Sequence, residues 1–381
     1  CWLMIWNAPE RLETFARLTP LFSLMESLLV GFGLLLHHRK GKDESPHWSL
    51  TGSSLAIFAA IMLLVNFAIA WPRVDILIAL GIVNAVSLTL LAFRGRFPLC
   101  HVPALASLTI SALLGFHVLG GTLPLEGVTQ RMLMEAMLLG RSAIVLLALA
   151  IGAGVGAMLL KNKSHREAAE YYLYAAVGLA CGSSLIAVYA GFYARTDVMW
   201  TTVALLLNSV VFLTANWHVR RPILSSSGSF LWFLTLQHAL CLNGPIRELL
   251  QSMHLRPDGP FAWGCLIHAS TSLLFLLALQ FWSQNRQKLQ NSWSLLPAEG
   301  NSFTSPLTAG AMITSVLMIP YALLQIMPAH MHAFYSFWLM LIWLGIALIL
   351  RSEVWFLCAQ FAGTAGTLYT ATAVGQRFDL W

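Results

Sequence analysis

The feature that most constrains this chain is a succession of apolar runs, each about as long as a membrane-spanning helix. A helix needs about 20 apolar residues to cross the hydrocarbon core of a bilayer. The runs are continuously apolar and do not alternate, which excludes the strands of a membrane barrel. The sequence therefore predicts an all-α fold, a polytopic transmembrane helical bundle of about 12 helices. The predicted helices cover residues 21–37, 49–70, 74–93, 102–120, 138–160, 171–193, 198–217, 229–243, 262–282, 307–327, 333–350 and 354–374.

Composition points to the same environment. Hydrophobic residues make up 58% of the chain and charged residues only 10%, whereas soluble domains carry about 25% charged residues. The 22 Lys and Arg against 16 Asp and Glu are dispersed along the chain. This distribution suits loops that face lipid headgroups and does not indicate nucleic-acid binding. We therefore expect membrane lipids as partners, with bound lipids retained, and further membrane protein subunits beside them.

Basic residues concentrate in every second connector. The positive-inside rule places connectors that are rich in Lys and Arg in the cytoplasm. We therefore predict a multi-pass protein of the plasma (inner) membrane in which every second connector is cytoplasmic. These connectors are 37–48, 94–101, 161–170, 218–228, 283–306 and 351–353.

Polar landmarks recur at a nearly constant spacing, which predicts parallel four-helix internal repeats. Asp197 follows Asp75 by 122 residues, and Asn208 follows Asn84 by 124. The predicted organisation has six parts. They are an outer-face interfacial segment or tail of a preceding helix (1–20), repeat 1 (21–120), repeat 2 (121–243), an outer interfacial helix or loop (244–261), helices 9–12 as a third repeat (262–374) and a tail (375–381).

Polar residues inside predicted spans are candidates for function because charged groups cost several kcal/mol in lipid. The candidates for an intramembrane polar site are Glu26, Glu135, Arg141, Asn84 and Asn208. Glu26 is a candidate proton or cation site, with water or a neighbouring arginine as the alternative environment. Glu135 and Arg141 flank the outer part of the fifth predicted helix. The two asparagines are repeat-related, which favours a structural role for them.

Histidines supply the only cofactor hypothesis. His117 and His238 occupy equivalent repeat positions near the outer ends of their helices. A neutral imidazole can ligate the iron or magnesium of a tetrapyrrole, but a histidine near a helix end is more often hydrogen-bonded at the interface. We predict no cofactor and no metal site, and keep a tetrapyrrole at His117 and His238 as the alternative.

Small residues spaced four apart predict close helix crossings. Such pairs occur at Gly152 and Gly156, at Gly178 and Gly182, and at Ala362 and Gly366.

No nucleotide-binding, metalloprotease or serine-hydrolase motif is present in the sequence, so no catalytic residue is predicted. The first hypothesis is a structural or accessory membrane protein within a larger assembly, without catalytic activity. The main alternative is a transporter or channel for a small solute. The lesser alternatives are a membrane enzyme acting on lipid-linked substrates and a tetrapyrrole-binding subunit.

Overall fold

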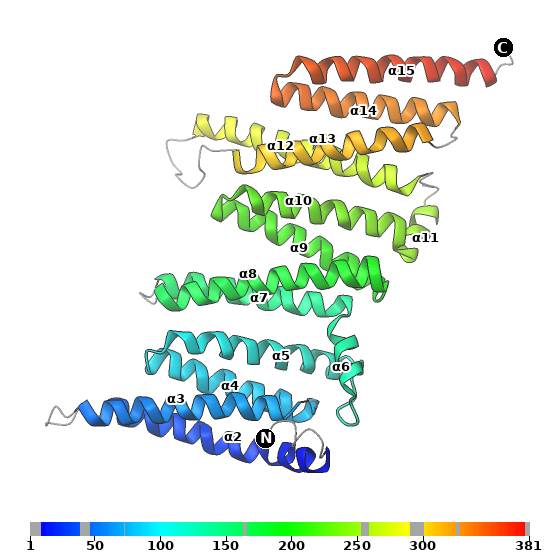
Figure 1. Ribbon diagram of the computed structural model, residues 1–381. Coiled ribbons are helices and arrows are strands. Elements are labelled where there is room, and N and C mark those ends of the chain that lie inside the picture. The colour runs from blue at the N-terminus through cyan, green and yellow to red at the C-terminus, as the bar shows by residue number, and fades with distance from the viewer. Residues whose placement is uncertain are drawn as a thin grey trace. The chain divides into compact units, whose positions relative to one another are not determined.

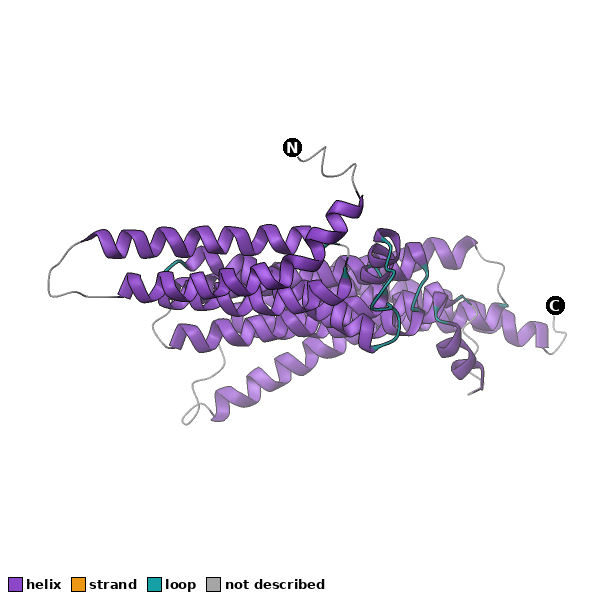
Figure 2. Ribbon diagram, turned by 90° about the horizontal axis from the view of Figure 1, so that it is seen from below, coloured by secondary structure: helices purple, strands orange, loops and turns teal. Residues whose placement is uncertain are grey.

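The fold is all-helical throughout the described part of the chain (Figures 1 and 2). The computed structural model describes residues 9–38, 46–71, 73–162, 166–252, 259–289, 301–324 and 328–377. The chain divides into two compact units between Ala190 and Gly191. This division falls near the end of the predicted helix 171–193, the second helix of the predicted repeat 2, and inside the π-helical turn η2 (Tyr189–Ala194).

Unit 1 consists of three antiparallel helical hairpins that follow one another along the chain (Figure 1). They pair α2 with α3, α4 with α5, and α7 with α8. A short amphipathic helix, α6, precedes the third hairpin. The helices are α2 (Pro9–His38), α3 (Pro46–Ile69), α4 (Val74–Arg94), the 3-10 turn η1 (Pro98–Cys100), α5 (His101–Leu119), α6 (Gln130–Met137), α7 (Gly140–Asn162) and α8 (Arg166–Val188).

Unit 2 repeats the hairpin construction, and a π-helical turn, η2, leads into it. It pairs α9 with α10, α12 with α13, and α14 with α15. The elements are η2 (Tyr189–Ala194), α9 (Val198–Val219), α10 (Pro222–Gln237), the π-helical turn η3 (His238–Leu242), α11 (Gly244–Ser252), α12 (Pro260–Leu289), α13 (Asn301–Leu324), α14 (Ala329–Leu350) and α15 (Glu353–Arg377).

Among the described residues, ten helices are long and apolar enough to cross a membrane. The two other predicted spans are also helical but do not meet that standard. Segment 229–243 falls in α10, which has 16 residues before the backbone changes to the π-helical η3. Segment 354–374 falls in α15, which has 25 residues but carries glutamine and several threonines in its middle.

Two predicted boundaries need correction. The fifth span begins at Gly140, and Glu135 belongs to the separate helix α6, which the sequence prediction missed. Thr129 caps α6, because its hydroxyl group accepts a hydrogen bond from the Met132 amide at 3.3 Å. The connector predicted at 283–306 is also shorter, because α12 continues to Leu289 and α13 begins at Asn301.

The first hairpin is held together by glycines that the sequence prediction did not select. A Cβ atom on Gly33 would lie 2.7 Å from the Gly52 carbonyl oxygen, and one on Gly52 would lie 2.6 Å from the Gly33 oxygen. The two backbones therefore approach closely because neither residue has a side chain. By contrast, Gly152 and Gly178 have no atoms of other elements within 4 Å of the Cβ position. The prediction of close crossings is therefore wrong at those two glycines. A Cβ atom on Gly156 would lie 3.1 Å from Tyr172, and one on Gly366 would lie 3.1 Å from Phe337, so the helices do approach closely at these two predicted positions.

Alanine and serine make the crossing between α7 and α8. Ala143, Ala150 and Ala157 of α7 are buried at intervals of seven residues. On α8, the Ser183 hydroxyl group donates a 2.6 Å hydrogen bond to the Ala143 carbonyl oxygen. A side chain can reach the carbonyl group of a neighbouring helix only where the two backbones lie close together. Alanine and serine therefore join the predicted Gly156, which meets Tyr172, at this interface.

Three hairpins turn through an arginine in the left-handed backbone conformation. Arg96, Arg220 and Arg351 have φ of 57°, 56° and 52°. Each lies two residues before the next helical element, which begins at Pro98, Pro222 and Glu353. A left-handed conformation costs a non-glycine residue about 1 kcal/mol or more. The three turns between α4 and α5, α9 and α10, and α14 and α15 therefore share one uncommon geometry.

Candidate functional site

A buried polar cluster joins α2, α3 and α4 inside unit 1. The Asn66 side-chain amide donates a 2.7 Å hydrogen bond to Glu26 Oε2, and the Glu26 side chain is only 9% exposed. At the next residue of α2, the Ser27 hydroxyl group accepts a 3.1 Å hydrogen bond from the Ser87 hydroxyl group of α4. Glu26 is therefore satisfied within the protein by an amide from the neighbouring helix.

The two asparagines that the predicted repeat relates make different contacts. Asn84 donates a 3.2 Å hydrogen bond from its side-chain amide to the Leu63 carbonyl oxygen on α3, and its own Oδ1 is buried without a partner. Asn208 donates to the Ala204 carbonyl oxygen of its own helix at 2.9 Å. Asn84 thus connects two helices, whereas this bond of Asn208 stays within α9.

Glu135 and Arg141 lie apart from the Glu26 cluster. The Arg131 guanidinium donates a 2.7 Å hydrogen bond to Glu135 Oε1, and both side chains are exposed on α6. That hydrogen bond and the carboxylate charge raise the pKa of Arg131 above its ordinary value. Arg141 is half-buried in the first turn of α7. The five residues proposed as one intramembrane site therefore occupy several places in the two units.

His117 is fully engaged by protein groups. Its Nδ1 lies 2.8 Å from the Thr122 hydroxyl oxygen, and its Nε2 lies 2.6 Å from the Ser142 hydroxyl oxygen. The side chain is fully buried. Through these two contacts the imidazole ties the end of α5 to the first turn of α7. An axial ligand of a tetrapyrrole needs one ring nitrogen free for the metal, and His117 offers neither in this arrangement.

His238 begins the π-helical turn η3 and is also buried. Its Nδ1 lies 2.9 Å from the Thr202 hydroxyl oxygen on α9, while Nε2 is buried without a hydrogen-bond partner. Its Cδ2 would lie 2.9 Å from a Cβ atom on Gly191, so only glycine leaves room for the ring. His238 therefore has one ring nitrogen available, but in a space already filled by protein.

His268 makes a comparable set of contacts inside unit 2. Its Nε2 lies 3.1 Å from the Ser229 hydroxyl oxygen of α10, and its Nδ1 lies 3.1 Å from the Thr314 hydroxyl oxygen of α13. The side chain is 1% exposed. A serine beside a histidine can serve nucleophilic catalysis, but a substrate could not reach this buried pair. His268 instead connects three helices.

Helix α15 carries a feature of another kind, an exposed polar stripe. Gln360, Thr364, Thr367 and Ala371 follow one face at intervals of four, three and four residues, and all four are exposed. The opposite face packs on α14, where Gly363 and Gly366 meet Met340 and Phe337. We call these four exposed residues the α15 stripe.

The threonines of the stripe are satisfied within the helix, but the glutamine is not. Thr364 donates to the Gln360 carbonyl oxygen at 2.9 Å, and Thr367 donates to the Thr364 carbonyl oxygen at 2.7 Å. The Gln360 side-chain amide makes no hydrogen bond to any residue that the structure describes. In hydrocarbon an unsatisfied amide costs several kcal/mol. The spacing is visible in the sequence, but the sequence does not reveal which face α14 covers.

The described residues contain no group of three or more His, Cys, Asp or Glu side chains that could hold a metal ion. A comparison of the chain with protein families, curated proteins and solved structures gives no match. The fold by itself nevertheless defines a class. With ten helices of spanning length and apolarity among the described residues, this chain is a polytopic integral membrane protein.

Proposed function

We propose that this chain is a structural membrane subunit without catalytic activity, and that α15 holds a transmembrane helix of another protein. The observation that carries the proposal is the exposed, unsatisfied Gln360 amide in the α15 stripe. α15 lies antiparallel along α14, which is itself a candidate span from Ala329 to Leu350. The contacts of Gly363 and Gly366 place Gln360 beside the middle part of α14. At that depth lipid offers no hydrogen-bonding group.

A transmembrane helix of a partner, packed on the stripe, would satisfy the Gln360 amide and cover the small residues beside it. Glutamine and threonine side chains form hydrogen bonds between membrane helices, each contributing roughly 1 kcal/mol. Small residues such as Ala371 allow the backbones to approach closely enough for dispersion contacts. Leu357, Phe361 and Leu368, which are also exposed on α15, are apolar and suit lipid. The partner therefore covers the stripe and leaves the apolar side of α15 in the bilayer.

The internal repeat belongs to the same proposal. The left-handed arginines at Arg96, Arg220 and Arg351 support three four-helix units, because each precedes the last helix of its unit. The units are α2 to α5, α7 to α10, and α12 to α15. We place the arginine turns on the cytoplasmic side of the plasma (inner) membrane, following the positive-inside rule.

Photocrosslinking in native membranes tests the partner. A photoreactive phenylalanine analogue at Thr364 lies in the stripe, whereas one at Phe361 lies on the apolar, 79% exposed side of the same helix. The account predicts an adduct with another membrane protein at Thr364 and lipid adducts at Phe361. The absence of a protein adduct at Thr364, or the same protein adduct at both positions, would contradict it.

Transport of a small solute is the second candidate, and the contact of Glu26 with Asn66 favours it. A carboxyl group held by an amide between two spans is chemically suited to a proton or a cation. Flux measured in proteoliposomes, compared with flux in the Glu26→Gln variant, tests this function. Flux that depends on Glu26, together with no protein adduct at Thr364, would favour the transporter over the structural subunit.

A further inference from the structure

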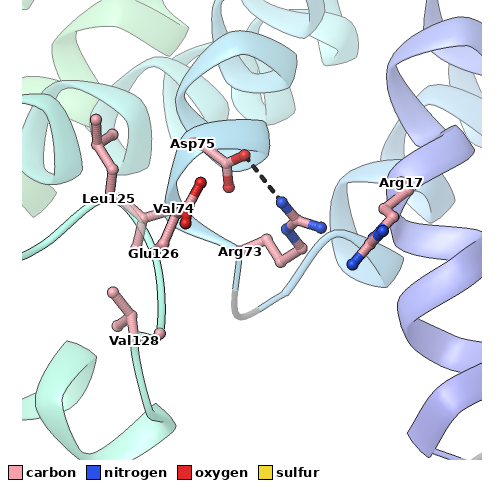
Figure 3. A pocket seen from close by; sticks show the side chains of 8 residues that line it. Arg17, Arg73, Val74, Asp75, Leu125, Glu126 and Val128 are labelled. Atoms are coloured by element: carbon pink, nitrogen blue, oxygen red, sulfur yellow. Dashed lines mark hydrogen bonds and ion pairs between the residues drawn. The ribbon is translucent and has the colours of Figure 1, made fainter.

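Unit 1 contains an open cavity at the end where α4 begins (Figure 3). Its volume is about 490 Å³, which lies within the range of about 300–1,000 Å³ that is usual for small-molecule sites. Arg17 comes from α2, Arg73 and Asp75 come from the start of α4, and Glu126 comes from the connector after α5. Three separate parts of the unit therefore converge on this cavity.

Charge is arranged with the cations on one side and the anions on the other. In Figure 3 the side chains follow in the order Arg17, Arg73, Asp75 and Glu126 across the cavity. Arg73 Nη2 lies 3.2 Å from Asp75 Oδ2. A guanidinium group has five N–H donors, so this ion pair leaves Arg73 able to donate to a ligand. The cavity thus offers guanidinium donors beside carboxylate acceptors.

The cavity lies beside the first residues of two candidate spans, and the ends of spans are where lipid headgroups surround a membrane protein. Arg17 is close to the start of the α2 span, which runs from Phe15 to His38, and Val74 is the first residue of the α4 span. Val74 and Leu125 also line the cavity, so part of its wall is apolar. A ligand here can keep a polar head in the cavity and an acyl chain beside the spans.

We propose that this cavity binds a zwitterion in which a phosphate ester is joined to a primary ammonium, as in the headgroup of phosphatidylethanolamine. Arg17 and Arg73 hold the phosphate, because guanidinium groups donate to phosphate oxygens in pairs. Asp75 and Glu126 accept hydrogen bonds from the ammonium. This surface is separate from the α15 stripe, so the proposal does not depend on the structural role.

The chemistry fixes an order of preference among lipids. The ammonium of ethanolamine donates three hydrogen bonds, whereas the quaternary ammonium of choline donates none. A glycerol headgroup carries no positive charge, so the Glu126 carboxylate would face the lipid phosphate with no cation between the two negative groups. Phosphatidylethanolamine is therefore preferred over phosphatidylcholine, and phosphatidylglycerol binds least.

Native mass spectrometry of the full chain with equal amounts of these three lipids tests the order. We expect phosphatidylethanolamine to be retained most, and Arg73→Gln to reduce its retention about tenfold, as loss of one charge-assisted contact predicts. Glu126→Gln removes the acceptor at the other end of the site and shifts the preference toward phosphatidylglycerol. Arg131→Gln is the matched control, because Arg131 lies on the exposed helix α6 and does not line the cavity.

Soluble phosphoethanolamine, added in a parallel titration, distinguishes a lipid from a free metabolite. Saturable binding of the soluble compound that Arg73→Gln abolishes would support the zwitterion site and assign it to a soluble source. Equal retention of the three lipids would overturn the proposal, as would retention that neither Arg73→Gln nor Glu126→Gln changes. Glu126 is exposed, so we expect the Glu126→Gln variant to fold. Its lipid preference therefore tests the proposal even if the Arg73→Gln variant is unstable.

Discussion

The Asn66 amide donates a 2.7 Å hydrogen bond to the Glu26 carboxyl group, and this bond joins α3 to α2 inside unit 1. Asn66→Leu should lower the free energy of unfolding by about 1–3 kcal/mol, because it leaves the Glu26 carboxyl group buried without a partner. The double variant Glu26→Leu with Asn66→Leu should be more stable than Asn66→Leu alone, since both polar groups are then removed. Thermal unfolding in detergent measures the two single variants, Asn66→Leu and Glu26→Leu, and the double variant.

Glu26→Gln is the control for this cycle because glutamine retains an acceptor oxygen at the same position. It should stay within about 1 kcal/mol of the natural protein. If the double variant is as unstable as the sum of the two single variants, Glu26 and Asn66 are not coupled, and the described contact does not stabilise the first hairpin.

Close packing of α2 on α3 gives a second prediction. Gly33→Ala should destabilise the protein by about 1–3 kcal/mol, because the new Cβ atom would lie 2.7 Å from the Gly52 carbonyl oxygen. Gly31→Ala is the matched control on the same helix, since nothing lies within 4 Å of its Cβ position. It should leave the free energy of unfolding unchanged or raise it slightly. Equal effects of the two variants would show that the helices do not meet at Gly33.

The left-handed arginine turns predict a stabilising substitution. Arg220 has φ of 56° and ends α9, whereas its neighbour Arg221 has φ of −109°. Arg220→Gly should raise the free energy of unfolding by roughly 0.5–1 kcal/mol, because glycine adopts the left-handed conformation without strain. Arg221→Gly removes the same charge without relieving strain, and should be neutral or destabilising. Thermal unfolding of the two variants at one salt concentration separates the backbone effect from the charge effect.

His117 provides a prediction about cofactors. Both of its ring nitrogens contact hydroxyl groups, at Thr122 and Ser142, so we expect the purified protein to show no Soret absorption band. Ser142→Ala should destabilise the protein by about 1–3 kcal/mol, because it removes the partner of a buried ring nitrogen. A Soret band that disappears in the His117→Ala or His238→Ala variant would instead establish a tetrapyrrole site.

Much of the fold could be predicted from the sequence because lipid imposes a simple rule. Every backbone polar group in the bilayer must be satisfied within its own segment, so long apolar runs become helices. Over the residues that the structure describes, each of the twelve predicted runs is mainly helical, including 229–243 and 354–374, although those two do not meet the standard for a span. The short helix α6 was missed because its eight residues carry both charges and apolar side chains, and a search for long apolar runs passes over it.

The contacts between helices could not be predicted in the same way. Apolar residues surround each helix in a membrane, so periodicity does not show which face meets protein and which meets lipid. Gly152 and Gly178 illustrate this, since no other element lies within 4 Å of their Cβ positions, whereas Gly156, four residues after Gly152, meets Tyr172. The contact of His117 with Ser142 was also missed, because Ser142 lies 25 residues later in the next hairpin. The converging charges at Arg17 and Glu126 likewise come from separate elements.

The most direct test of the structural role is the mass of the complex extracted gently from native membranes. The account predicts that the natural chain migrates with a second membrane protein at fixed stoichiometry, and that Gln360→Leu releases that protein. The Leu357→Ala variant, altered on the apolar side of the same helix, should retain it. If the chain is extracted without a partner, or if Gln360→Leu retains the partner as fully as Leu357→Ala does, then α15 does not hold another helix and the structural role is contradicted.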